Sequence, residues 1–85
     1  MDNKLKLLRE EINALDASIL AILSKRAACS LNIAKYKHDC GIERLDSVRE
    51  KEIVNNLQRM NKGSLSEKDI EEVFKKIITV CRNLT

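Results

Sequence analysis

Residues 5–36 read LKLLREEINALDASILAILSKRAACSLNIAKY, and the apolar positions in this stretch decide the fold. They recur in alternating steps of three and four, the spacing that places side chains on one face of an α-helix. We call this face the seam; its positions are Leu5, Leu8, Ile12, Leu15, Ile19, Ile22, Arg26, Cys29, Ile33 and Tyr36. The first helix breaker after the seam is Gly41. The pattern therefore predicts one helix over residues 4–39.

This helix is too long for a compact chain of 85 residues. At about 1.5 Å per residue it is roughly 54 Å long, whereas a compact chain of this size has a radius of gyration of about 12 Å. Part of the seam must therefore lie outside its own monomer. An exposed apolar stripe of this kind is typical of a surface that another chain covers. We expect an intertwined helical homodimer.

A second, shorter helix is predicted over residues 47–61. Ser47 and Glu50 have the spacing of a capping box at its start. Gly63 is expected to end it, because glycine is common just after the last helical residue.

A third helix is predicted after Ser66 and Asp69, which again have the spacing of a helix cap. Its apolar face is strong and consists of Ile70, Val73, Phe74, Ile77, Ile78 and Cys81. The predicted fold class is therefore all-α, with one long N-terminal helix and two shorter helices. Residues 1–85 are expected to form a single domain.

The composition indicates a cytoplasmic protein. Cys29, Cys40 and Cys81 form no C-x-x-C pair, which is typical of reduced thiols. The N-terminus is charged, and we expect neither a signal peptide nor an apolar run of membrane-spanning length. The formal net charge is +3, and charges of both signs alternate along the chain. The net charge does not decide whether the partner is nucleic acid, a membrane surface or a small anion.

Arg26 is the charged residue of the seam. An unpaired guanidinium among apolar side chains would cost several kcal/mol, so Arg26 requires an anion from the protein or from a ligand. From position alone, an acidic residue on another helix is the simpler partner. Lys37 lies about 16 Å further along the helix axis in nearly the same direction around it, so the two cations could hold a small anion between them. Taken alone, Lys37 is typical of a solvated residue.

Two further clusters permit both a structural and a functional interpretation. Arg9 is about 25 Å from Arg26 along the helix, so it could reach a shared ligand only from the partner of an antiparallel pair; otherwise it is a solvated first-turn residue. Asp46, Arg49 and Glu50 lie at a helix start, where acids are favourable without any ligand. They could also bind hydroxyl groups of an anionic substrate.

Three segments in this order, LREEINALDASILAILSKR (8–26), IAKYK (33–37) and LDSVREKEI (45–53), resemble the all-helical, intertwined-dimer (type II) chorismate mutases. The resemblance covers residues 7–84. It implies that chorismate is converted to prephenate by an intramolecular Claisen rearrangement, in phenylalanine and tyrosine biosynthesis, without cofactor or metal. This reaction requires that a flexible dianion be held in its reactive shape and that charge on the ether oxygen be stabilised. A substrate carboxylate would then be the anion that Arg26 requires.

The resemblance also implies roles at the carboxylate end of the substrate. Arg26 and the partner's Arg9 would bind the two carboxylates. Lys37 would donate to the ether oxygen and to a carboxylate. With Glu50, Arg26 and Lys37 are the expected catalytic residues.

At the other end, the resemblance implies that Glu50, with Asp46 nearby, accepts a hydrogen bond from the substrate hydroxyl. Arg49 would organise this end of the site. Cys81 occupies a position where the family commonly has a small polar residue that lines the pocket.

One departure from the family concerns CRNLT at residues 81–85. The family commonly has a glutamine, or in some members a glutamate, as the second donor to the ether oxygen where this sequence has Thr85, its terminal residue. A hydroxyl is shorter than an amide, and helix ends fray. We therefore expect a weaker second hydrogen bond and a slow enzyme that Thr85→Gln would accelerate.

Three other functions remain open from the sequence. The same cations could serve an isochorismate pyruvate lyase. The chain could instead be a regulatory domain that binds chorismate or prephenate for an enzyme of the aromatic pathway. A helical dimer that binds nucleic acid through Lys25, Lys35 and Lys37 is disfavoured, because acids interrupt the basic faces and stacking aromatics are scarce. We expect no nucleic-acid or membrane partner.

Overall fold

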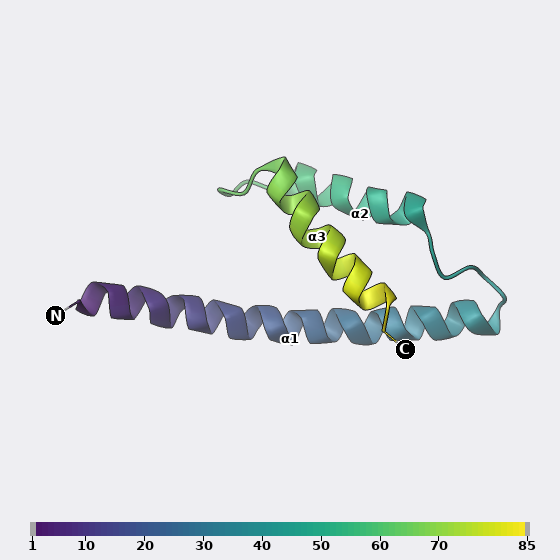
Figure 1. Ribbon diagram of the computed structural model, residues 1–85, viewed down its shortest axis with the longest axis horizontal. Coiled ribbons are helices and arrows are strands. Elements are labelled where there is room, and N and C mark those ends of the chain that lie inside the picture. The colour runs from purple at the N-terminus through teal and green to yellow at the C-terminus, as the bar shows by residue number, and fades with distance from the viewer. Residues whose placement is uncertain (1, 85) are drawn as a thin grey trace.

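The computed structural model describes residues 2–84 and contains α1 (Asn3–Asp39), α2 (Ser47–Met60) and α3 (Glu67–Arg82). No strand occurs within this range. Figure 1 shows α1 as a rod whose N-terminal part extends beyond α2 and α3, which lie over its C-terminal part. The prediction of an all-α fold with one long and two shorter helices is confirmed.

The limits of α1 follow from local hydrogen bonds. At its start, the Asp2 side chain accepts a hydrogen bond from the backbone N–H of Leu5 at 3.1 Å. At its end, Gly41 has a φ of +68°, a left-handed conformation that favours glycine. The observed helix differs from the predicted range of 4–39 by one residue.

Most of α1 is uncovered within the described chain. No residue of α1 is buried, and the seam residues Leu8, Ile12 and Ile19 are 49%, 57% and 53% exposed. The molecule measures 60 × 25 × 16 Å and has a radius of gyration of 16.5 Å, against about 12 Å for a compact chain of this length. The expected excess length of α1 is therefore present.

The hydropathy of α1 corrects one expectation. An 18-residue window of this helix has a mean hydropathy of 1.2 and meets the length and composition of a membrane span, although the sequence was expected to hold no such run. The result follows from the many apolar residues of the seam and its flanks. Their spacing of three and four, with Arg26 among them, is that of a helix face that packs against protein.

The core lies mainly between α2 and α3. Its buried side chains within the described residues are Val54, Ile70, Ile78 and Cys81. α3 packs against α2 on one side and against α1 on the other. Of the apolar face predicted for α3, Val73 is still 49% exposed. This small core positions the first turn of α2 and the last turn of α3 opposite the C-terminal half of α1.

α2 begins at Ser47, as predicted, but its N-cap differs from the predicted one. Its N-cap is Asp46, whose Oδ1 accepts a hydrogen bond from the N–H of Arg49 at 2.9 Å, and Ser47 is the first helical residue. A carboxylate satisfies this N–H as a hydroxyl would and also interacts favourably with the helix dipole. The helix ends at Met60 with Asn61 as its C-cap, before the expected Gly63.

The start of α3 confirms the predicted cap. Ser66 Oγ accepts from the N–H of Asp69, and Asp69 Oδ2 accepts from the N–H of Ser66, both at 3.0 Å. The hydrogen bonds with Ser66 lower the pKa of Asp69 from its ordinary value. This reciprocal pair fixes where the polypeptide turns from the loop after α2 into α3.

Candidate active site

A cleft opens between the C-terminal half of α1, the start of α2 and the end of α3. Its volume is about 270 Å³, close to the lower limit of about 300 Å³ that is usual for small-molecule sites. The charged residues that line it are Arg26, Lys37, Arg44, Asp46, Arg49, Glu50 and Arg82. Five cations and two carboxylates thus surround a site of small-molecule size.

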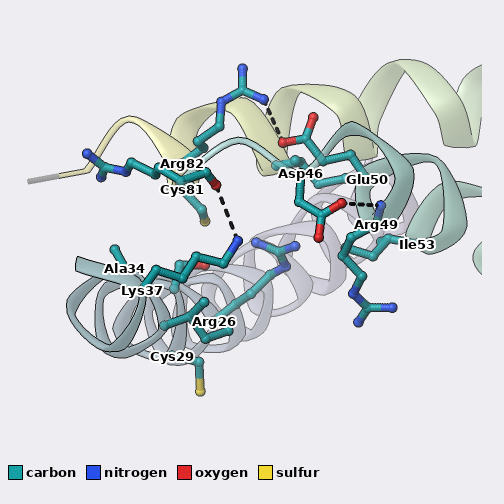
Figure 2. A pocket seen from close by; sticks show the side chains of 14 residues that line it. Arg26, Cys29, Ala34, Lys37, Asp46, Arg49, Glu50, Ile53, Cys81 and Arg82 are labelled. Atoms are coloured by element: carbon teal, nitrogen blue, oxygen red, sulfur yellow. Dashed lines mark hydrogen bonds and ion pairs between the residues drawn. The ribbon is translucent and has the colours of Figure 1, made fainter. Parts of the chain in front are cut away.

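Arg26 and Lys37 form the α1 wall of this cleft. Both residues are partly buried, and Figure 2 shows their side chains directed toward the space below Asp46. Within residues 2–84, neither side chain has a carboxylate within 4.0 Å. Lys37 Nζ donates a hydrogen bond to the carbonyl oxygen of Arg44 at 3.3 Å. The internal acid that could have been the partner of Arg26 is therefore not found in the described chain.

The start of α2 supplies the two carboxylates. Asp46 is exposed and engaged with the N–H of Arg49 as the N-cap. Glu50 is partly buried, and its Oε2 lies 2.6 Å from Arg82 Nη1. The Arg49 guanidinium pairs instead with Glu52 at 2.6 Å and points away from Glu50. Glu50 and Asp46 thus both line the cleft, with the Glu50 carboxylate turned toward Arg82 and the Arg49 guanidinium directed away from it.

Of the other three residues of the predicted site, one lines the cleft and one does not, and the third is not described by the structure. Cys81 is buried and lines the cleft from α3. Arg9 is exposed on the N-terminal part of α1 and does not line the cleft of its own chain. Thr85 lies outside the described residues.

Two cations of the cleft were missed by sequence analysis. Arg82, in the last turn of α3, pairs with Glu50 across 32 residues. Arg44 donates from Nη2 to the carbonyl oxygen of Leu84, across 40 residues. The available signals were weak, since a basic residue in a last helical turn is common for its effect on the helix dipole, and Arg44 lies in a loop.

The site has the chemistry of an anion receptor with a carboxylate at one end. The two cations of α1 can bind carboxylates, and Glu50 can accept a hydrogen bond from a hydroxyl. Within residues 2–84, no group of three or more His, Cys, Asp or Glu side chains could hold a metal ion. The arrangement suits a small, anionic, hydroxylated molecule.

Comparison with known proteins identifies relatives across nearly the whole chain. The sequence profile of the family described as chorismate mutase type II matches residues 8–85. The bifunctional chorismate mutase/prephenate dehydratase of Stutzerimonas stutzeri is 30% identical over 84 residues, which are 93% of this chain and 23% of that protein. The protein of the same description from Aquifex aeolicus is 31% identical over 85 residues, 95% of this chain and 24% of that protein. The chain thus spans about a quarter of the length of these relatives.

Solved structures agree with this relationship. Form II of the chorismate mutase from Thermus thermophilus superposes with a TM-score of 0.95 at 27% identity, covering 96% of this chain and 93% of that one. Form I of the same protein gives a TM-score of 0.91 at 26% identity, covering 93% of this chain and 99% of that one. The three-helix arrangement and the length of α1 are therefore shared with these proteins.

Proposed function

The chain belongs to the chorismate mutase type II family, and from this premise we propose that it converts chorismate to prephenate. The observation that supports this most directly is the pair formed by Arg26 and Lys37. Both side chains enter a cleft of small-molecule size, and within residues 2–84 neither has a carboxylate partner. A substrate with two carboxylates would supply the missing anions.

The reaction breaks a carbon–oxygen bond and forms a carbon–carbon bond within one molecule, and no proton is transferred. The protein therefore has to hold the substrate in its compact reactive conformation and stabilise the charge that develops on the ether oxygen. Arg26 is placed to bind a carboxylate. Lys37 has three N–H donors, so it can keep its hydrogen bond to the carbonyl of Arg44 and still donate to the ether oxygen and to a carboxylate.

The opposite end of the cleft is proposed to bind the substrate hydroxyl. Oε2 of Glu50 is engaged with Arg82, which leaves Oε1 available as an acceptor. Asp46 lies beside it at the N-cap of α2, and Cys81 contributes to the wall. The roles of Arg49 and Thr85 remain those that the family resemblance implies, with Arg49 close to the hydroxyl end and Thr85 as the second donor.

The proposed active unit is an intertwined homodimer. The exposed seam of α1 supports this assembly, since it is an apolar stripe without a cover in the described chain. Arg9, exposed on that same helix, is proposed to reach the cleft of the partner. We place the activity in phenylalanine and tyrosine biosynthesis in the cytoplasm, a compartment that suits the free thiols of Cys29 and Cys40.

The activity is tested by following the loss of the diene absorbance of chorismate with purified protein and then identifying the product. Prephenate is the expected product. Release of pyruvate from isochorismate, with chorismate left unchanged, would instead assign a lyase. Binding of chorismate or prephenate without turnover would make the chain a sensing domain and contradict the proposal.

The shared site is tested by mixing two variants. Arg9→Ala and Arg26→Ala should each be inactive alone. In a two-fold dimer, a mixed pair has one site with both arginines and one with neither, so an equal mixture that exchanges freely should recover about a quarter of wild-type activity. A mixture that stays as inactive as its components, while sedimentation shows mixed dimers, would contradict the contribution of Arg9.

A further inference from the structure

We propose that Arg82 is a positioning residue, which fixes the carboxylate of Glu50 as the acceptor for the substrate hydroxyl. The inference rests on the proposed function, because the role of Glu50 does. It concerns a residue for which neither the sequence pattern nor the family resemblance implied a role.

The Arg82–Glu50 pair differs from the other ion pairs of the described chain. Its atoms are 2.6 Å apart, and the side chains are only 29% and 28% exposed. The Arg49–Glu52 pair is 57% exposed on both sides, and in the Lys75–Glu71 pair the side chains are 66% and 48% exposed. The two exposed pairs each lie within one helix, whereas Arg82 and Glu50 join α3 to α2. A partly desolvated pair between elements holds its geometry more firmly than exposed pairs do.

The pairing leaves the Glu50 carboxylate able to accept a further hydrogen bond. Arg82 engages Oε2, and Oε1 has no hydrogen-bond partner within residues 2–84. A glutamate that is free at all of its side-chain torsions would have to lose that freedom when the substrate binds. Because Arg82 restricts the carboxylate beforehand, the acceptor is already in place when the hydroxyl arrives.

The position of the Arg82 guanidinium favours this indirect role over direct contact with the substrate. In Figure 2 the guanidinium lies beyond the Glu50 carboxylate, on the side away from Arg26 and Lys37. A substrate held by those two cations would meet the carboxylates of Asp46 and Glu50 before the Arg82 guanidinium. Arg82 then acts on the substrate through Glu50.

A double-mutant cycle in the full chain tests this inference, using Arg82→Met, Glu50→Gln and the combination. Arg82→Met keeps an unbranched side chain but removes the guanidinium. We expect it to lower kcat/KM about tenfold in the wild-type background and by less than about twofold in the Glu50→Gln background, because its effect passes through the carboxylate. Lys75→Met, which breaks an exposed ion pair on the same helix, is the matched control and should change kcat/KM by less than about twofold.

The outcomes separate the inference from the proposed function. If the wild-type protein does not convert chorismate, the proposed function fails, and this inference fails with it. If the wild-type protein is active but the losses in kcat/KM from the two substitutions multiply in the double variant, Arg82 acts independently of Glu50. The inference alone is then overturned. Thermal unfolding checks that each variant is folded. Should Arg82→Met not fold, Arg82→Lys replaces it in the same cycle, with an expected loss of about threefold that disappears in the Glu50→Gln background.

Discussion

Arg26→Met separates the two interpretations of a charge on the seam. If Arg26 serves a ligand, methionine keeps the apolar stem and removes a cation that has no carboxylate within 4.0 Å in residues 2–84. Because Arg26 is only partly buried, water in the open cleft solvates its guanidinium when no ligand is bound. The free energy of unfolding of the ligand-free protein should then change by less than about 1 kcal/mol. If Arg26 were half of an internal ion pair, its removal would leave an unpaired partner and cost about 3–5 kcal/mol.

The effect on activity should be large. Losing the hydrogen bonds of a guanidinium to a substrate carboxylate removes about 2–4 kcal/mol of transition-state binding, and each 1.4 kcal/mol is a factor of ten. We therefore expect kcat/KM to fall between about 30-fold and 700-fold. Lys25→Met is the matched control, because Lys25 is an exposed cation on the same helix that does not line the cleft.

The measurements are kcat/KM, from the loss of chorismate absorbance, and urea unfolding without ligand. Both are made on wild type, Arg26→Met and Lys25→Met. The reasoning is refuted if Arg26→Met keeps its activity within about threefold of wild type, or if it loses several kcal/mol of stability. Retained activity would show that Arg26 does not bind the ligand. A large loss of stability would show that Arg26 is half of an internal ion pair.

Three further predictions concern the N-cap of α3, the loop before α2 and the position of Thr85. Ser66→Ala should lower the free energy of unfolding by about 1 kcal/mol, since it removes the acceptor of the α3 cap. The control Ser64→Ala alters no cap and should leave the free energy of unfolding unchanged. Equal urea midpoints for the two variants would contradict this prediction. Arg44→Met should lower kcat about threefold to tenfold, because the loop whose carbonyl accepts from Lys37 loses its hydrogen bond to Leu84, just after α3; an unchanged kcat would argue against that support. Thr85→Gln should raise kcat about tenfold or more by supplying a longer donor, and a kcat at or below that of wild type would oppose the implied position of Thr85.

The helices could be predicted because their signals are local. The spacing of the seam predicted the length of α1 to within one residue, and the reciprocal hydrogen bonds of Ser66 and Asp69 lie within a segment of four residues. The N-cap of α2 was misassigned by one position, since Asp46 and Ser47 are adjacent and either side chain can accept from an N–H near the helix start. Only the backbone geometry decides between them.

In the candidate site, too, some residues could be predicted from a local pattern and others could not. Arg26 was identifiable because a charge interrupts an apolar series, which is a property of one helix. Arg82 was not, because its partner Glu50 is 32 residues away on another helix. The direction of the Arg49 side chain toward Glu52 was hidden for a different, local reason, since a helix start brings several charges within reach of one another. Pattern reasoning finds residues that violate a local rule, and it misses those whose role depends on a distant contact.

The structure also joins stability to the proposed chemistry. The buried core of the described residues consists of Val54, Ile70, Ile78 and Cys81, which is little for a chain of 85 residues. Within the described residues, many of the exposed large apolar side chains lie on the seam of α1, the helix that also carries Arg9, Arg26 and Lys37. If the seam is covered by a second copy, the contact that completes the core is the same contact that brings Arg9 to the cleft. Folding, association and completion of the site would then be one event, and a substitution that weakens the seam would reduce activity without touching the substrate.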